Sequence, residues 1–305
     1  MSKRAADFHA RGSVHALRGE WSKAEPHLRL AASTGAGPAA RHALALALLA
    51  QGRLREGLPL YAHRASVPGL GIAKPRFAAP EWTGGDLTGK HLVVFPEQGL
   101  GDQIMFARYV PELRGLAADV TFICLPPLVR LFEQLGVRTV PAAGTLEFPE
   151  PDAWVMLADL PLRLEAFDLE GAPYLSAPAR SPGGIGLVRR GNPKHPNDLA
   201  RSMPDGIEPP FPTVSLAPED TGALDFMDTA EIVAGLDAVV SVDTSIAHLA
   251  GALGKRTFVI LPEIGPDWRW GERIERTAWY DSVTLIRLNA QFDWAAALVE
   301  ISRRL

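Results

Sequence analysis

Residues 238–249 read AVVSVDTSIAHL and join a buried strand, a small polar turn and the start of a helix. The run Ala238–Val242 is short, apolar and rich in valine, as in a strand covered on both faces. An alanine-rich helical pattern follows and ends at Gly254, a residue type common just beyond helix C-termini. A strand that leads directly into a helix predicts a parallel sheet with helical crossovers.

The same alternation of strand and helix occurs in two series along the chain. Strands are expected at 92–95, 120–125 and 154–157, then at 185–188, 213–216, 238–242 and 257–261. Helices fit near 102–116 and 127–135 in the first series, and near 228–236, 245–253 and 292–305 in the second. The stretch Ser181–Gly184 (SPGG) separates the two series and predicts an interdomain hinge. The fold class is therefore α/β, with one domain in residues 89–180 and another in residues 181–305.

Residues 1–66 have a helical pattern that repeats once. Three positions recur 33 residues later, since Gly19, Trp21 and Ala24 return as Gly52, Leu54 and Gly57. The tetratricopeptide repeat has a similar period and the same types of residue at these offsets, so this pattern predicts tetratricopeptide-like helices. An unrelated alanine-rich hairpin is the alternative. Two imperfect copies fall short of the roughly three needed for an independent stack, so these helices are expected to pack on something else. Residues 67–88, rich in proline and glycine, are expected to be a linker.

The composition excludes several classes of function. The 305 residues include 31 basic and 35 acidic side chains, with a formal charge of −4 and a pI near 6.1, which argues against a nucleic-acid partner. No apolar run approaches the roughly 20 residues that span a bilayer, so no membrane span is expected. The N-terminus lacks the apolar core of a secretory signal, and Cys124 has no second cysteine to pair with. These features predict a cytoplasmic protein.

A glycine-rich turn directly follows the strand at 92–95. In open α/β sheets, ligands bind beyond the carboxyl ends of the strands, where helices begin. Here the chain reads Glu97, Gln98, Gly99, Leu100, Gly101, Asp102. The glycines allow the backbone to approach a ligand closely, and Asp102 lies where the helix begins. The alternative is that Asp102 is only a helix N-cap. The third glycine of the dinucleotide fingerprint and the lysine of a P-loop are both missing.

The opening stretch supplies a second candidate site at its polar turn. Asp243, Thr244 and Ser245 join strand to helix, and their hydroxyl and backbone N–H groups can donate to an anion such as a diphosphate. The alternative is an ordinary capped crossover helix, with His248 a partly buried imidazole that has a hydrogen-bond partner.

A basic loop follows the first strand of the second series. It runs from Arg189 to Asp198 with Arg201 close behind, and it includes Asn192 and Lys194. Its cations can face the same cleft as Thr244, although such a loop is more often simply solvated. The later block 267–270 (DWRW) is aromatic enough to stack on a sugar or base, but tryptophans in this position are more often packed between domains.

Taken together, these motifs resemble those of bacterial tetratricopeptide-linked glycosyltransferases. Such proteins are related to the heptosyltransferases of glycosyltransferase family 9 and, more distantly, to the protein O-glycosyltransferases of family 41. The resemblance covers roughly residues 80–285. It is most specific in the blocks 97–109 (EQGLGDQIMFARY) and 243–255 (DTSIAHLAGALGK).

The resemblance implies a GT-B fold, in which two Rossmann-like domains face each other across a cleft. It also implies inverting sugar transfer from a nucleotide-sugar co-substrate, with no required metal and no further cofactor. Asp102 matches the motif's aspartate and would be the catalytic base. The donor would be bound by Asp243, Thr244, Ser245, His248, Asn192, Lys194 and Arg201, and the acceptor-side loop would be Glu97, Gln98, Gly99 and Gly101.

The function that follows is transfer of a sugar to a protein Ser or Thr hydroxyl, with the N-terminal helices docking the protein acceptor. Flagellin is one acceptor that the resemblance suggests. One departure is the connection Met203–Pro212, which contains four prolines and is too short and broken for the expected crossover helix. That departure motivates the first alternative, a catalytically degenerate sugar-nucleotide-binding or adaptor protein. A further alternative is a heptosyltransferase-like enzyme acting on a glycolipid, although the sequence shows no clear membrane-facing patch.

Overall fold

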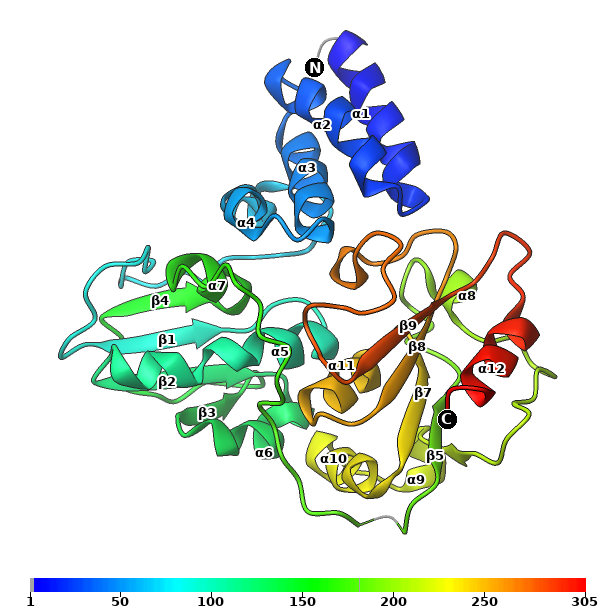
Figure 1. Ribbon diagram of the computed structural model, residues 1–305. Coiled ribbons are helices and arrows are strands. Elements are labelled where there is room, and N and C mark those ends of the chain that lie inside the picture. Colours follow the sequence, from blue (N-terminus) through cyan, green and yellow to red (C-terminus); the bar gives the residue numbers. More distant parts are fainter. Residues whose placement is uncertain (1–2, 181) are drawn as a thin grey trace.

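The computed structural model describes residues 3–180 and 182–305, so Ser181 of the predicted hinge and the first two residues lie outside the described part. The chain forms a helical segment (residues 3–66) and two α/β units, which we call the first unit (residues 91–163) and the second unit (residues 185–302). Figure 1 shows the helical segment above both units, with the two sheets on either side of α5 and α11. The predicted α/β class with parallel sheets is confirmed.

The first unit is built on a four-stranded sheet in the order β3-β2-β1-β4. Its strands are β1 (His91–Phe95), β2 (Asp119–Cys124), β3 (Arg138–Pro141) and β4 (Ala153–Met156). Each pairing is parallel, and in the central β1 Val93 lies between Thr121 and Trp154. The strand β3 is an edge strand that ends in a proline and is partly exposed, so it lacks the apolar run by which the other strands were predicted.

The second unit is built on a five-stranded sheet in the order β6-β5-β7-β8-β9. Its strands are β5 (Ile185–Val188), β6 (Val214–Ser215), β7 (Ala238–Val242), β8 (Thr257–Leu261) and β9 (Val283–Arg287), all paired in parallel. The edge strand β9 was not predicted, and β6 at the other edge has only two residues. No helix is present from Ser202 to Thr213, a stretch that the structure describes throughout. This agrees with the broken connection expected there.

Short helices connect the strands. In the first unit they are α5 (Leu100–Phe106), α6 (Val129–Phe132) and α7 (Leu160–Arg163), with 3₁₀ turns η2 (Ala107–Tyr109), η3 (Pro111–Gly115), η4 (Pro126–Leu128), η5 (Glu133–Leu135) and η6 (Leu157–Asp159). In the second unit they are α8 (Asp198–Arg201), α9 (Pro218–Thr221), α10 (Phe226–Gly235), α11 (Ser245–Ala252), η7 (Trp268–Trp270) and α12 (Trp294–Ser302). The helix expected over 102–116 ends at Phe106 and continues as 3₁₀ turns, because Pro111 has no N–H for an α-helical hydrogen bond. None of the described helices has the length and apolar character that crossing a membrane requires.

The helical segment consists of two hairpins, α1 (Lys3–Leu17) with α2 (Trp21–Ser33) and α3 (Pro38–Ala50) with α4 (Leu54–Tyr61), followed by the 3₁₀ turn η1 (Arg64–Ser66). The turn glycines at positions 19 and 52 both adopt positive φ, +65° and +73°. A Cβ atom on Gly12 would lie 3.3 Å from the Ala24 carbonyl oxygen, and one on Gly57 would lie 3.2 Å from the Ala45 carbonyl oxygen. Positions 12 and 24 of the first hairpin correspond to positions 45 and 57 of the second, 33 residues later, so the helices of both hairpins cross at the same point. The glycine is on the first helix of one hairpin and on the second helix of the other. The recurrence in sequence is therefore a repeat in structure.

The helical segment is joined to the first unit through a buried arginine. Arg64, which is 1% exposed, donates from Nε to Glu97 Oε2 at 2.6 Å and from Nη1 to Asp159 Oδ1 at 2.6 Å, and its Nη2 also pairs with Glu97. Both carboxylates are buried. The charge of Arg64 therefore stabilises two acidic groups that would be costly to bury alone.

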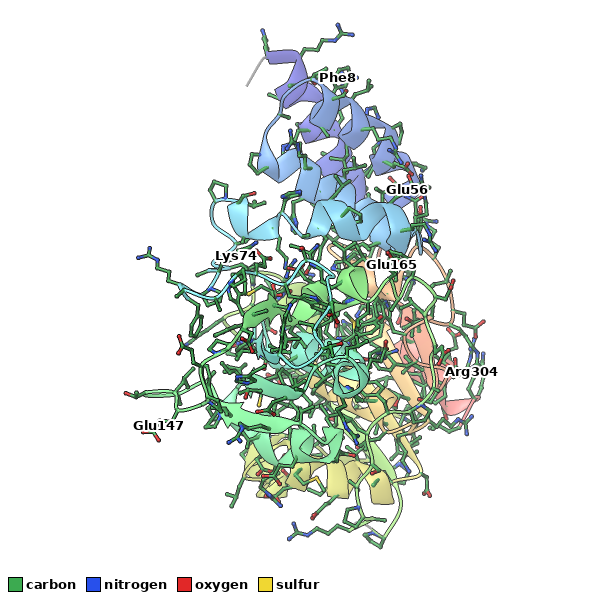
Figure 2. The ribbon with its side chains drawn as sticks, turned by 90° about the vertical axis from the view of Figure 1, so that its left-hand side faces the viewer. Phe8, Glu56, Lys74, Glu147, Glu165 and Arg304 are labelled. Atoms are coloured by element: carbon green, nitrogen blue, oxygen red, sulfur yellow. The ribbon has the colours of Figure 1, made fainter. Side chains whose placement is uncertain are left out.

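The helical segment also contacts the second unit. The Gly265 N–H donates to the Leu17 carbonyl oxygen at 2.6 Å, and Ser22 donates from its backbone and hydroxyl groups to Glu272 at 2.8 and 2.9 Å. One buried apolar cluster continues through all three parts, including Leu48, Phe106 and Trp270. Figure 2 shows Glu165 of the chain following α7 directly beneath the helical segment, and Phe8 at that segment's far end. The helices thus pack on the rest of the chain, as two imperfect repeats must.

Replacing Arg64 with methionine is expected to lower the free energy of unfolding by about 3–5 kcal/mol, because two buried carboxylates lose their partner. Arg29→Met is the matched control, since Arg29 is 45% exposed and pairs with Glu25 and Glu56 on the surface. That change is expected to cost less than about 1 kcal/mol. Urea denaturation of the two variants measures the difference, and equal losses would show that Arg64 does not hold the helical segment in place.

Candidate functional site

A cavity of about 1010 Å³ lies between the two units, at the carboxyl ends of their strands. The sequence-predicted site residues in its lining are Gly99, Gly101 and Asp102 from the first unit and Asn192, Arg201, Asp243, Thr244, Ser245 and His248 from the second. Glu97, Gln98 and Lys194 lie outside that lining. Two loops far apart in sequence therefore form one cleft.

Asp102 stands at the start of α5. The N-cap residue is Gly99, and Asp102 lies three positions later, where its Oδ2 accepts the Gly99 N–H at 2.9 Å. Its other oxygen pairs with Arg269 of the second unit. Burial raises the pKa of Asp102, while the charge of Arg269 opposes that rise. The Asp102 side chain is 21% exposed and borders the cavity, so it can still accept a proton from a bound group.

Gly101 is a point of close approach between the two units. A Cβ atom at this position would lie 2.8 Å from His248 Cδ2 and 3.3 Å from Ser245 Cα. The glycine therefore allows α5 to pack directly on α11, side by side in Figure 1. This contact brings Asp102 and the start of α11 to the same cavity.

The polar turn after β7 presents the N-terminus of α11 to the cavity. Thr244 is the N-cap residue, and its Oγ1 lies 3.2 Å from Ser241 Oγ. The first N–H groups of a helix have no partner within the helix and, with the helix dipole, favour an anion. Burial and the nearby Asp267 raise the pKa of Asp243 to about 6. Asp243 therefore takes up a proton at a higher pH than an exposed aspartate would.

His248 supports this turn as a neutral side chain. It is 6% exposed, its ring stacks on Trp270 with centroids 4.9 Å apart, and its Nδ1 lies 3.0 Å from Tyr280 Oη. Burial and the charge of Arg269 lower the pKa of His248 to about 3. The imidazole thus packs between α5 and Trp270, and carries no charge at neutral pH.

The basic loop contributes one buried cation to the turn. Arg201 is 9% exposed, and its Nη1 donates to the Asp243 carbonyl oxygen at 2.8 Å. Asn192 and Lys194 form a local turn, in which Asn192 Oδ1 accepts the Lys194 N–H at 3.0 Å. Lys194 is exposed. Arg201 therefore holds the β7–α11 turn in place, whereas the Lys194 side chain lies away from the cavity lining.

Glu97 and Gln98 face the helical segment. Glu97 pairs with Arg64 and also accepts the Ala158 N–H at 3.1 Å. Gln98 donates from Nε2 to Tyr61 Oη at 2.7 Å. These two residues of the predicted acceptor-side loop thus attach that loop to the helices.

Arg269 and Asp267 are cavity-lining residues that the sequence reasoning did not assign. The block 267–270 was considered only for its aromatic side chains. In the structure Trp268 and Trp270 are 5% and 0% exposed and pack in the shared core, which corresponds to the packing alternative. The available signal was the alternation of polar residues with tryptophans in this block. Among the described residues, no group of three or more His, Cys, Asp or Glu side chains is arranged to hold a metal ion.

Comparison with known proteins gives one informative relative. The chain is 29% identical over 306 residues to Protein FlbA of Caulobacter vibrioides, an alignment that covers 79% of this chain and 50% of that protein. The chain thus spans about half the length of this curated relative, whose name states no activity. No family model matches the chain, and no solved structure matches it.

Gly101→Ala is expected to destabilise the protein by about 1–3 kcal/mol, because the added methyl group would separate α5 from α11. Helix propensity alone would make the alanine variant more stable than the wild type. A loss of stability would therefore report the close packing of α5 on α11. The control is Gly115→Ala, where the new Cβ atom would meet nothing within 4 Å. Thermal or urea unfolding compares the two variants. A Gly101→Ala protein as stable as the control would contradict close packing at this point.

The neutral state of His248 predicts a dependence of stability on pH. Because its pKa falls from 6.5 to about 3 on folding, its contribution is complete above pH 6.5 and is lost as the pH falls towards 3. Between pH 7 and pH 5, the wild type should lose about 2 kcal/mol more than His248→Gln. Urea unfolding at both pH values provides the comparison, and parallel losses in the two proteins would mean that folding does not lower the pKa of His248.

Proposed function

We propose that this protein is an inverting glycosyltransferase of GT-B architecture, which moves a sugar from a nucleotide donor to a Ser or Thr hydroxyl of a protein. One observation carries the proposal: Asp102 of the first unit and the N-terminus of α11 of the second unit border the same cavity. A carboxylate opposite a preorganised anion site is the combination that direct displacement at an anomeric carbon needs.

In this proposal Asp102 is the general base. It takes the proton from the acceptor hydroxyl as the oxygen attacks the anomeric carbon and the bond to the phosphate oxygen breaks. The hydrogen bond from Gly99 fixes the orientation of the carboxylate, and each carboxylate oxygen has more than one lone pair. Asp102 can therefore keep its contacts with Gly99 and Arg269 and accept the proton.

The leaving phosphate is proposed to bind at the start of α11. The hydroxyl groups of Thr244 and Ser245 and the first N–H groups of the helix supply donors without carrying net charge. Arg201 supports this turn through the Asp243 carbonyl group. No metal or further cofactor is required by this arrangement.

The helical segment is proposed to be tetratricopeptide-like and to dock the protein acceptor, which the resemblance suggests is flagellin. The 33-residue structural repeat and the matching close contacts at Gly12 and Gly57 support the first part. The position of the segment above both units supports the second (Figure 1). A cytoplasmic location completes the proposal.

Asp102→Asn is expected to lower the rate of transfer by about 10²–10⁴-fold, because the amide cannot accept the proton. Binding of the sugar nucleotide should be retained. Thr244→Val should instead weaken donor binding. Asp168→Asn is the control, since Asp168 is exposed and outside the cavity lining. Mass spectrometry of acceptor protein incubated with UDP-, GDP-, ADP- and CMP-sugars measures transfer, and unchanged transfer by both site variants would refute the site assignment.

A second candidate is a catalytically degenerate sugar-nucleotide-binding or adaptor protein. It is favoured by the two-residue strand β6 and by the helix-free stretch 202–213 next to the cavity. Calorimetry with the same sugar nucleotides separates the candidates. Binding with turnover supports the transferase, binding without turnover supports the degenerate protein, and no binding by folded protein excludes both as sugar-nucleotide proteins.

A further inference from the structure

Arg269 reaches from one unit to the proposed base of the other. It lies in η7, after β8, and its guanidinium pairs with Asp102 at the start of α5, 167 residues earlier in the chain. The Arg269 side chain is only 7% exposed. An arginine buried this far is held by specific partners, because its charge would otherwise be too costly to desolvate.

Three further contacts fix the guanidinium. Arg269 Nη1 donates to both carboxylate oxygens of Asp267 at 2.9 Å. Its planar group lies over the Trp268 ring, 4.6 Å from the centroid. From the other side, Gln98 Oε1 accepts from Arg269 Nη2 at 3.2 Å. The guanidinium is thus located by residues of both units.

Gln98 extends this set of contacts to the helical segment. Its amide nitrogen donates to Tyr61 Oη at 2.7 Å, and the Tyr61 ring lies 5.9 Å from that of Trp268. Gln98 has a φ of +58°, an unfavourable backbone conformation for a residue with a side chain. A strained backbone conformation persists where the surrounding contacts hold the residue in place. The contacts of Gln98 also connect α4 to Arg269.

We propose that Arg269 is a positioning residue that keeps Asp102 ionised and aimed into the cleft. The inference rests on the proposed role of Asp102 as a base, since a carboxylate that is already protonated cannot take a proton from a hydroxyl group.

The charges around Asp102 explain why it needs this partner. Burial raises the pKa of Asp102, and the carboxylates of Asp267 and Glu97 raise it further. The groups that oppose this rise are Arg269 and the Gly99 N–H. Three other titratable groups lie close by. Burial raises the pKa of Tyr61 and lowers the pKa values of His195 and His248, so burial favours the neutral form of each. Without Arg269, burial and two acidic neighbours would act on Asp102 with one hydrogen bond against them.

The inference is tested by the titration of Asp102 in the full-length protein, labelled with ¹³C at the aspartate carboxyl groups and assigned with Asp102→Asn. Arg269→Met should move the Asp102 midpoint upward by at least about one pH unit, the range expected for loss of a close opposite charge. Arg269→Lys, which retains the charge, should move it less. Arg269→Gln removes the charge but retains hydrogen bonding, and it serves if the methionine variant does not fold.

The control is Arg130→Met. Arg130 also pairs across the two units, with Asp225 at 2.8 Å and Asp228 at 3.0 Å. Asp102 is hydrogen-bonded to other residues, Gly99 and Arg269. This variant should leave the Asp102 midpoint unchanged. A midpoint that is the same in wild type and in folded Arg269→Met or Arg269→Gln would overturn the inference.

Two further readouts separate this role from others. If the protein transfers sugar, the acid limb of the pH–rate profile should move upward with the Asp102 midpoint in Arg269→Met. If Arg269 instead bound the donor phosphate, its loss would weaken binding of inorganic pyrophosphate and leave the Asp102 midpoint in place, which contradicts our inference. Absence of transfer with any donor would refute the proposed function, while the titration would still report whether Arg269 controls Asp102.

Discussion

The close contact of α5 with α11 is the constraint on which the rest of the structure depends. Each helix begins at the carboxyl end of a strand, β1 in one sheet and β7 in the other, so joining the helices at Gly101 and His248 places both loop regions at one cleft. A side chain on Gly101 would occupy the space of the His248 ring. The imidazole is itself confined by Trp270 and Tyr280. The distance between the proposed base on one sheet and the proposed anion site on the other is therefore determined by packing.

The helical segment is part of this arrangement. Arg64 and Tyr61 hold Glu97 and Gln98, the residues immediately before the Gly99–Asp102 turn. The contacts of Leu17 and Ser22 reach the second unit as well. A protein acceptor bound to these helices would thus be held by the same elements that position the proposed base. The helical segment would then contribute to the geometry of the cleft as well as to the proposed recognition of an acceptor.

The sequence predicted best what depends on local pattern. Buried strands such as β7 and β8 were found because both faces are apolar, whereas β3 and β9 were missed because they lie at sheet edges and mix polar with apolar residues. The two strand-end loops were found for the same local reason, as small and polar residues between strand and helix. Their partners could not be found, since Arg269 and Arg64 contact residues 167 and 33 positions away. Nothing in the local spacing of Glu97 showed that its carboxylate would face Arg64 rather than a ligand.

The central claim is that Asp102 and the start of α11 form one site for a sugar nucleotide. The most direct measurement is a crystal structure of the protein with the sugar nucleotide that binds most tightly in calorimetry. Our account predicts phosphate oxygens within hydrogen-bond distance of Thr244 and Ser245, with the anomeric carbon of the sugar facing Asp102 across the cavity. A nucleotide bound outside this cleft, or with its sugar directed away from Asp102, would contradict it.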